Sequence, residues 1–159
     1  MSEADLQSRV MAALDEVMDP EIRGLSLVDL GMVERVEVDG GQVRVQLIPT
    51  YVGCPALGLM KADVERRLAA VPGVESVTVE FLRKPLWTTD RITPRGRERL
   101  KAVGIAPPAG SGPTEHWTPE CPYCGSTQVH RENVFGPTSC RSIFYCDACR
   151  NPFEAIKPV

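Results

Sequence analysis

Residues Cys121–Gly125 read Cys-Pro-Tyr-Cys-Gly, and residues Cys146–Cys149 read Cys-Asp-Ala-Cys. Two such Cys-x-x-Cys pairs, about twenty residues apart, place four thiolates at the spacing of a tetrahedral zinc site. A segment this short has too small an apolar core to fold without help, so a metal ion supplies much of its folding free energy. The pattern therefore predicts one metal ion held by Cys121, Cys124, Cys146 and Cys149. Four thiolates favour zinc, but they also suit iron or an iron–sulfur centre.

Three residues near the pairs complete this interpretation. Gly125 follows the first pair, where a positive φ is commonly required. Cys140 could be a fifth ligand, a substitute ligand or a buried small residue, and we favour burial or a supporting role. His130 is interpreted as a strand residue, because four cysteines already complete the ligand shell.

The chain before these cysteines shows the pattern of an α+β domain with a small three-stranded sheet. Apolar residues at helical spacing alternate with short runs of strand residues, and the Asp-Gly-Gly at residues 39–41 signals a hairpin turn. A strand, a helix and a second strand then form a βαβ unit. We expect the order αββαβα, with helices over residues 2–19, 55–71 and 94–104, and strands over Val33–Val38, Val43–Leu47 and Val77–Phe81.

Composition separates this domain from the cysteine-rich segment. Residues 105–119 are rich in proline and glycine and carry little to bury, so they are predicted to be a linker. The expected organisation is a domain over residues 1–104, the linker, and a four-cysteine metal ribbon over residues 120–159.

Cys54 is separate from the other cysteines and precedes Pro55, which suits the first turn of a helix. At the N-cap of that helix, its thiolate would be stabilised by free backbone N–H groups, which would lower its pKa. The alternative is a buried cysteine that packs as a small apolar residue. The nearby Asp19 and Glu21 either end the first helix or add a polar element near the thiol, and from the residues alone the first interpretation is favoured.

Composition also excludes several classes of function. The 159 residues carry a net charge of -3, which argues against a protein that coats nucleic acid. No apolar run approaches the ~20 residues of a membrane-spanning helix, and the acidic N-terminus does not resemble a signal peptide. We therefore expect a cytoplasmic protein that binds neither membrane nor nucleic acid. Neither histidine lies in a Glu-x-x-His pair, so a di-iron carboxylate centre is not encoded.

Two resemblances add to this picture. The segments Asp19–Ile22, Leu27–Gly31 and Thr50–Pro55 resemble the SufT-like domain of iron–sulfur cluster assembly factors. The segments Trp87–Ile92 and Gly104–Pro108, together with the cysteine ribbon, resemble the family of D components of the bacterial phenylacetyl-CoA epoxidase (phenylacetate-CoA oxygenase) system. The likeness covers nearly the whole chain.

The resemblance implies an accessory protein in aerobic phenylacetate breakdown, with no established catalytic step of its own. It implies that Cys54 is the family's reactive cysteine, that Asp19, Glu21 and Thr50 belong to the motifs around it, and that Cys140 is an additional thiol. The expected partners are the other epoxidase subunits, and a homodimer is compatible with the pattern. We expect the protein to assemble or maintain the iron–sulfur or di-iron centre of the epoxidase, with a cluster held transiently at Cys54. The alternative is an electron-transfer or structural subunit of the oxygenase.

Overall fold

The fold is described from a computed structural model that covers residues 2–50, 53, 55–108, 117–138 and 140–159. Contacts divide the chain into two units, Met1–Trp87 and Thr88–Val159, and each is described by itself. In the described ranges, none of the helices has both the length and the apolar character needed to cross a bilayer.

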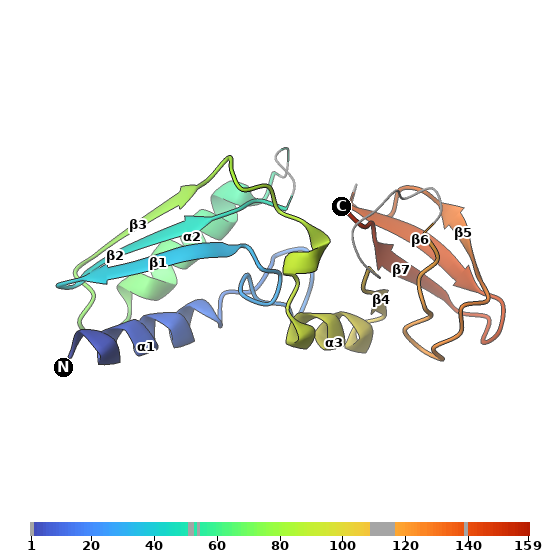
Figure 1. Ribbon diagram of the computed structural model, residues 1–159, viewed down its shortest axis with the longest axis horizontal. Helices are drawn as coiled ribbons and strands as arrows, with labels where there is room; N and C mark the ends of the chain where they lie inside the picture. Colours follow the sequence, from blue (N-terminus) through green and yellow to red (C-terminus); the bar gives the residue numbers. More distant parts are fainter. Residues whose placement is uncertain (1, 51–52, 54, 109–116, 139) are drawn as a thin grey trace. The chain divides into compact units, whose positions relative to one another are not determined.

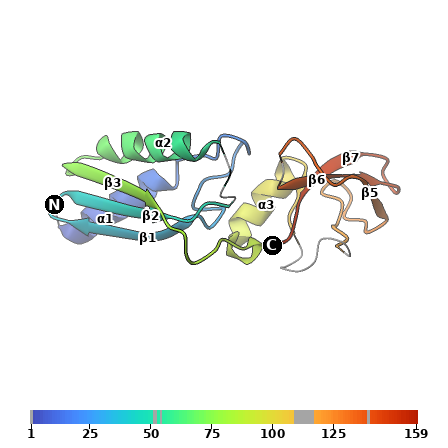
Figure 2. The same cartoon turned by 90° about the horizontal axis from the view of Figure 1, so that it is seen from above.

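The first unit is a three-stranded sheet with two helices packed on one face (Figures 1 and 2). The sheet order is β1-β2-β3, with β1 antiparallel to β2 and β2 parallel to β3. Along β2, Val43, Val45 and Leu47 are buried, whereas the intervening residues face away from the helices. The elements are α1 (Glu3–Leu14), β1 (Val33–Asp39), β2 (Gln42–Leu47), α2 (Leu57–Ala69) and β3 (Ser76–Phe81).

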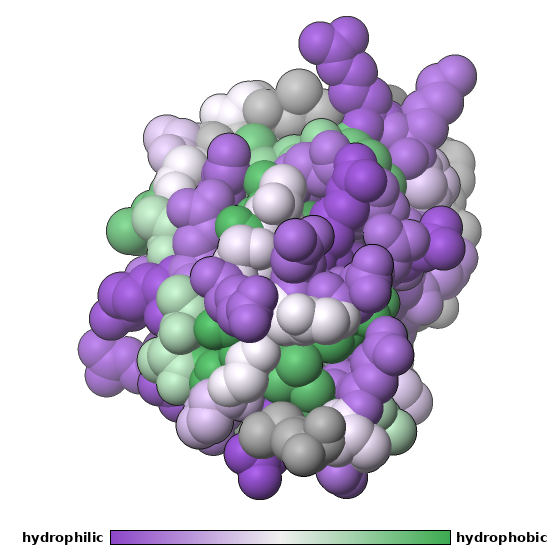
Figure 3. Space-filling view, turned by 90° about the vertical axis from the view of Figure 1, so that its left-hand side faces the viewer, coloured by the Kyte–Doolittle hydropathy of each residue, from purple (hydrophilic) through white to green (hydrophobic). Residues whose placement is uncertain are grey.

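Local signals in the sequence explain most of these elements, and the α+β prediction is confirmed. Ser2 and Asp5 form a reciprocal capping box at the start of α1. Gly40 and Gly41 have positive φ in the turn between β1 and β2, as a tight hairpin requires. Figure 3 views the end of the molecule that carries this turn and the N-terminus, and most of its side chains are hydrophilic.

Two helix boundaries in the first unit differ from the prediction. Helix α1 ends at Leu14, well before Asp19–Pro20, and a turn through Asp15 and Glu16 leads the chain into a loop. Val17 is nevertheless buried, and its carbonyl accepts a hydrogen bond from the Leu27 amide within that loop. The helical spacing of the apolar residues therefore indicated burial at Val17, and the prediction that the helix continues to residue 19 is wrong. Helix α2 begins at Leu57 with Ala56 as its N-cap, two residues later than the start predicted at Pro55. The prediction for Cys54 itself lies outside the described residues.

The second unit is a four-stranded sheet joined to a short helix. The order is β4-β7-β6-β5, with β4 parallel to β7 and the other neighbours antiparallel. Thr93 caps α3 by accepting a hydrogen bond from the Gly96 amide on its side-chain oxygen. The elements are a 3-10 turn η1 (Thr89–Arg91), α3 (Pro94–Ala102), β4 (Ile105–Ala106), β5 (Val129–Asn133), β6 (Arg141–Cys146) and β7 (Pro152–Ile156).

The division between the units falls between Trp87 and Thr88, whereas the sequence pattern placed it at residues 105–119. Ile105 and Ala106, inside the expected linker, pair with β7 and are buried. The Arg97 side chain donates hydrogen bonds to the carbonyls of Pro108 and Thr89, which ties α3 to the segments before and after it. Residues 109–116 of the expected linker lie outside the described residues.

Candidate metal centre

The four cysteines of the two pairs lie together in the second unit. Their sulfur atoms are all within 4.8 Å of one another. The Cys121 and Cys149 sulfurs are 3.7 Å apart, and those of Cys124 and Cys146 are 3.6 Å apart. A tetrahedral ion with sulfur ligands at ~2.3 Å has sulfur–sulfur edges of ~3.8 Å, so the arrangement fits a single ion.

Two turns of the same geometry present these sulfurs. In the first, the Gly125 amide donates to the Cys121 carbonyl at 2.9 Å; in the second, the Arg150 amide donates to the Cys146 carbonyl at 2.8 Å. Both residues have positive φ, 75° at Gly125 and 63° at Arg150. The first value confirms the expectation for Gly125. The second shows that the same backbone conformation is required even where the residue is not glycine.

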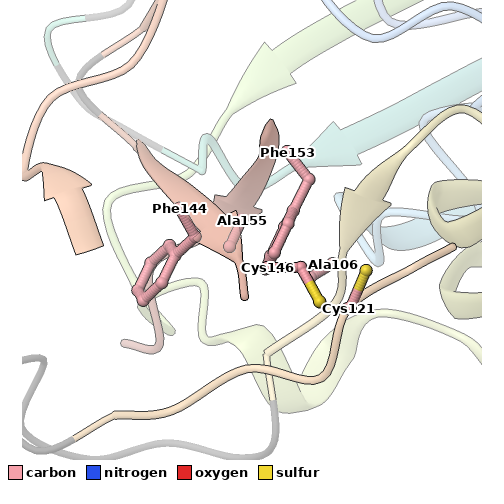
Figure 4. Close-up of a cluster of buried hydrophobic side chains, with 6 residues drawn as sticks. All are labelled: Ala106, Cys121, Phe144, Cys146, Phe153 and Ala155. Atoms are coloured by element: carbon pink, nitrogen blue, oxygen red, sulfur yellow. The ribbon is translucent and has the colours of Figure 1, made fainter. Parts of the chain in front are cut away.

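A small cluster of buried apolar side chains includes two of the four cysteines (Figure 4). Phe144 and Phe153 stack with ring centres 5.8 Å apart, and Trp117 packs edge-on against Phe144 at 5.1 Å. Cys121 and Cys146 are buried members of the cluster, so two of the four ligands are also core residues. The members are Ala106, Cys121, Phe144, Cys146, Phe153 and Ala155.

Backbone and side-chain N–H groups favour negative charge on the sulfurs. The Cys149 amide donates to the Cys146 sulfur at 3.5 Å, and the Asn151 side-chain amide donates to the Cys149 sulfur at 3.4 Å. The Asn151 bond is the main reason why the pKa of Cys149 is lowered to about 7. Asn151 was not predicted as a site residue, and its place two residues after the second pair is the only signal that could have suggested it.

The metal-free thiols do not all ionise together. Burial raises the pKa of the Cys121 thiol. At Cys124, a hydrogen bond from the Ser126 amide lowers the pKa, but desolvation and the neighbouring thiols outweigh it and raise the pKa to about 12. Four adjacent thiolates repel one another, so a bound cation is needed to hold all four in the ionised form. The donor set and its geometry therefore fit a divalent metal ion.

Cys140 and His130 lie outside this ligand group. The Cys140 sulfur is 3.0 Å from the Thr138 hydroxyl, and the side chain is half-buried. Among the described residues, the group able to hold a metal contains neither Cys140 nor His130. His130 lies in β5, where its ring contacts Asp147 and Glu132, and these two hydrogen bonds, the Asp147 bond first, raise its pKa.

The residues grouped with Cys54 belong to the first unit. Cys54 itself lies outside the described residues. Asp19 is nearly buried, and its carboxylate accepts bonds from the amides of Glu21 and Ile22 at 2.7 and 2.9 Å. It thus closes its own loop, whereas Glu21 is exposed and Thr50 half-buried. The proximity of these three residues to the Cys54 thiol remains a prediction.

Asp29 is a buried carboxylate that was not named as a candidate. It is fully buried; one of its oxygens accepts a bond from the Ser26 amide at 3.2 Å, and its own amide donates to the Ser26 hydroxyl at 3.0 Å. Ser26 in turn donates to the Asp15 carboxylate. Its position inside the motif Leu27–Gly31 was the available signal.

Comparison with known proteins matches the two parts of the chain to two separate families. Residues 7–81 match the model of the family described as iron-sulfur cluster assembly protein, and residues 106–157 match the PaaD zinc beta ribbon domain. A protein of Escherichia coli, named as the D component of 1,2-phenylacetyl-CoA epoxidase, is 40% identical over 93% of this chain and 90% of its own length.

Two further relatives resemble mainly the first part. The Bacillus subtilis protein YitW, named as an Fe-S protein maturation auxiliary factor, is 35% identical over 66% of this chain and 99% of its own length. The crystal structure of a domain of unknown function from Bacillus anthracis is 30% identical, with a TM-score of 0.58, and covers 63% of this chain and 95% of that one.

Proposed function

The chain belongs to the family of 1,2-phenylacetyl-CoA epoxidase D components, and we propose that it is an accessory protein that assembles or maintains a metal centre of that epoxidase. The observation that carries the proposal is the match of residues 7–81 to iron-sulfur cluster assembly proteins, because this region contains Cys54 and its neighbouring motifs. The relative named as a maturation factor, which aligns over nearly all of its own length, supports the same role.

We propose that the ion held by the second unit is a resident zinc with a structural role. In a cluster of four irons, each cysteine binds a different iron, so the sulfurs are spread around the cluster. Sulfur atoms within 4.8 Å of one another favour a single ion instead. All four protein ligands together leave no open coordination position, which is typical of structural rather than catalytic zinc. When bound, the ion would stabilise the fold of the ribbon.

The transferred iron or cluster is cargo in this proposal, and Cys54 is its ligand. The Cys54 thiol would lose its proton and bind the iron of the cargo as a thiolate. A thiolate of the client would then replace the Cys54 sulfur by ligand exchange, so that one iron–sulfur bond breaks as another forms. One cysteine is too few for a stable site, so a second chain or the client supplies further ligands. Asp19 contributes by fixing the loop that carries Glu21, through its bonds to the two backbone amides.

The second candidate is an electron-transfer or structural subunit of the oxygenase. One observation favours electron transfer: four sulfurs at single-ion spacing suit a redox-active iron as well as zinc. Elemental analysis and an absorption spectrum of protein purified without oxygen separate the two. Zinc without visible absorption supports the structural assignment, and iron with thiolate-to-iron absorption supports electron transfer.

The decisive experiment compares turnover by purified, metal-replete catalytic and reductase subunits with and without this protein. We expect turnover to be independent of it, whereas cells that lack its gene accumulate epoxidase deficient in iron. Cys54→Ser should mimic the deletion and leave the zinc content unchanged. Cys140→Ser is the matched control and should restore the deletion strain. A stoichiometric requirement for this protein during turnover would contradict the maturation role and favour the second candidate.

A further inference from the structure

An open apolar groove of about 530 Å³ lies in the first unit, and two of its lining residues, Pro49 and Leu57, precede and follow residues 50–56 in the chain. Its walls come from three places: Ile48 and Pro49 after β2, Leu57 at the start of α2, and the segment between Phe81 and Trp87 after β3. Figure 1 shows why these meet, because the carboxyl ends of the parallel strands β2 and β3 lie at the end of the sheet where α2 begins.

The groove is held in a defined shape. The Leu82 amide donates to the Leu47 carbonyl at 2.8 Å, which continues the pairing of β2 and β3 beyond the strands. The Trp87 indole N–H donates to the Leu30 carbonyl at 2.7 Å and fixes the far wall. Leu86 is 70% exposed, so a large apolar side chain stands at the rim in water.

The charges at the rim are of one sign. Arg83 lines the groove and Lys84 follows it, both exposed, and the described lining contains no carboxylate. In the part of the chain that the structure describes, neither cation forms an ion pair. This contrasts with the net charge of -3 of the whole chain. A ligand that matches both the apolar lining and the positive charge has an apolar side chain that fills the groove and carboxylates that pair with the cations at its rim.

We infer that this groove binds a peptide segment of the client protein in which an apolar residue lies beside acidic residues. A peptide suits the groove because it is partly open to solvent, whereas sites for small molecules enclose most of the ligand. Pro49 and Leu57 flank residues 50–56, so a segment bound here contacts residues close in the chain to Cys54. The inference rests on the proposed maturation role and names how the client is recognised.

The test uses the full chain and an array of synthetic 15-residue peptides that tile the other epoxidase subunits. Peptides that bind should share an apolar residue next to Asp or Glu, and their affinities are then measured by fluorescence anisotropy. Leu86→Asp should weaken binding about tenfold or more, because it removes the apolar rim and adds a like charge. The double variant Arg83→Glu with Lys84→Glu should weaken it similarly at low salt and less at high salt.

Two variants on α2 serve as matched controls. Leu59 is 54% exposed and Lys61 is exposed, and neither lines the groove. Leu59→Asp and Lys61→Glu should therefore leave affinity unchanged. Unaltered binding by Leu86→Asp would overturn the inference, as would the absence of any bound peptide. A change confined to oligomeric state, measured by sedimentation, would assign the groove to self-association and also overturn it.

Binding is also measured with the Cys54→Ser variant, which separates this inference from the maturation role. The variant should bind the same peptides with the same affinity, since the contacts inferred here come from Leu86, from Arg83 and from its exposed neighbour Lys84. If Cys54→Ser supports full maturation in cells while peptide binding still depends on Leu86, the proposed function is wrong and peptide binding in the groove is confirmed. If maturation requires Cys54 but Leu86→Asp binds peptides normally, only the inference about the groove is wrong.

Discussion

The two units of this chain are stabilised in different ways. In the first unit, two helices cover one face of a sheet, and side chains such as Leu14, Leu47 and Leu68 are fully buried. The second unit buries a cluster of six residues, two of which are cysteines of the metal group. From this comparison we expect apolar burial to hold the first unit without a ligand, and we expect the second unit to depend on a metal ion as well as on its smaller core.

Metal removal should produce the largest difference between the units. Cys146→Ser deletes a ligand that is also a core residue, and structural zinc contributes about 10–16 kcal/mol of apparent binding free energy. We expect the strands of the second unit to lose protection in hydrogen exchange, β4 included because it pairs with β7, while the first unit stays protected. Cys140→Ser should retain full metal content and protection. Equal loss in both units would show that they do not fold independently.

Truncation of the apolar core should affect only the first unit. Leu68→Ala removes a fully buried side chain of α2 and should cost about 2–5 kcal/mol, measured by urea denaturation of the zinc-loaded protein. Leu59→Ala on the same helix is the control, and it should change stability by less than about 1 kcal/mol because Leu59 is largely exposed. A loss of zinc in Leu68→Ala would mean that the metal site depends on the first core.

A glycine contact shows how α3 is joined to the ribbon. Gly104 has a φ of 78°, and a Cβ at this position would overlap the hydroxyl of Tyr123. Tyr123 stands between Cys121 and Cys124 in the sequence. Gly104→Ala should therefore destabilise the second unit by about 1–3 kcal/mol in thermal denaturation. Tyr123→Phe alone should be nearly neutral, and combined with Gly104→Ala it should recover part of the loss. No recovery would assign the whole cost to the backbone conformation.

The smallest effects on stability should come from the turns that follow the two cysteine pairs, where Gly125 and Arg150 can be tested by a matched pair of substitutions. Gly125→Ala places a side chain at positive φ and should destabilise the second unit by about 1 kcal/mol, whereas Arg150→Gly should stabilise it by up to about that amount. The difference is measurable as opposite shifts in the zinc concentration needed for half-maximal folding. Shifts of the same sign would show that the two turns are not equivalent.

Sequence patterns made their best predictions where the signal is local. The hairpin turn was predicted from the adjacent residues 39–41, and the caps found at Ser2 and Thr93 involve residues only three positions apart, so the chain specifies them without distant contacts. The prediction for the end of α1 was wrong for the opposite reason. Val17 kept the apolar spacing of the helix, but its backbone hydrogen bond is made by Leu27 of a loop that only the folded unit brings near.

The sequence alone identified the four cysteines whose sulfurs lie together, because the spacing within each Cys-x-x-Cys pair directs both sulfurs toward one point. It also determined the α+β order of the first part through apolar periodicity. Only the tertiary structure decided that α3 and β4 belong with the ribbon, and that Leu57 and Leu86 line one groove. These relations join residues distant in the chain, and they exist only once strands pair and side chains pack. The bond from Asn151 to the Cys149 sulfur is local, but the residue type at that position does not by itself fix where its side chain points.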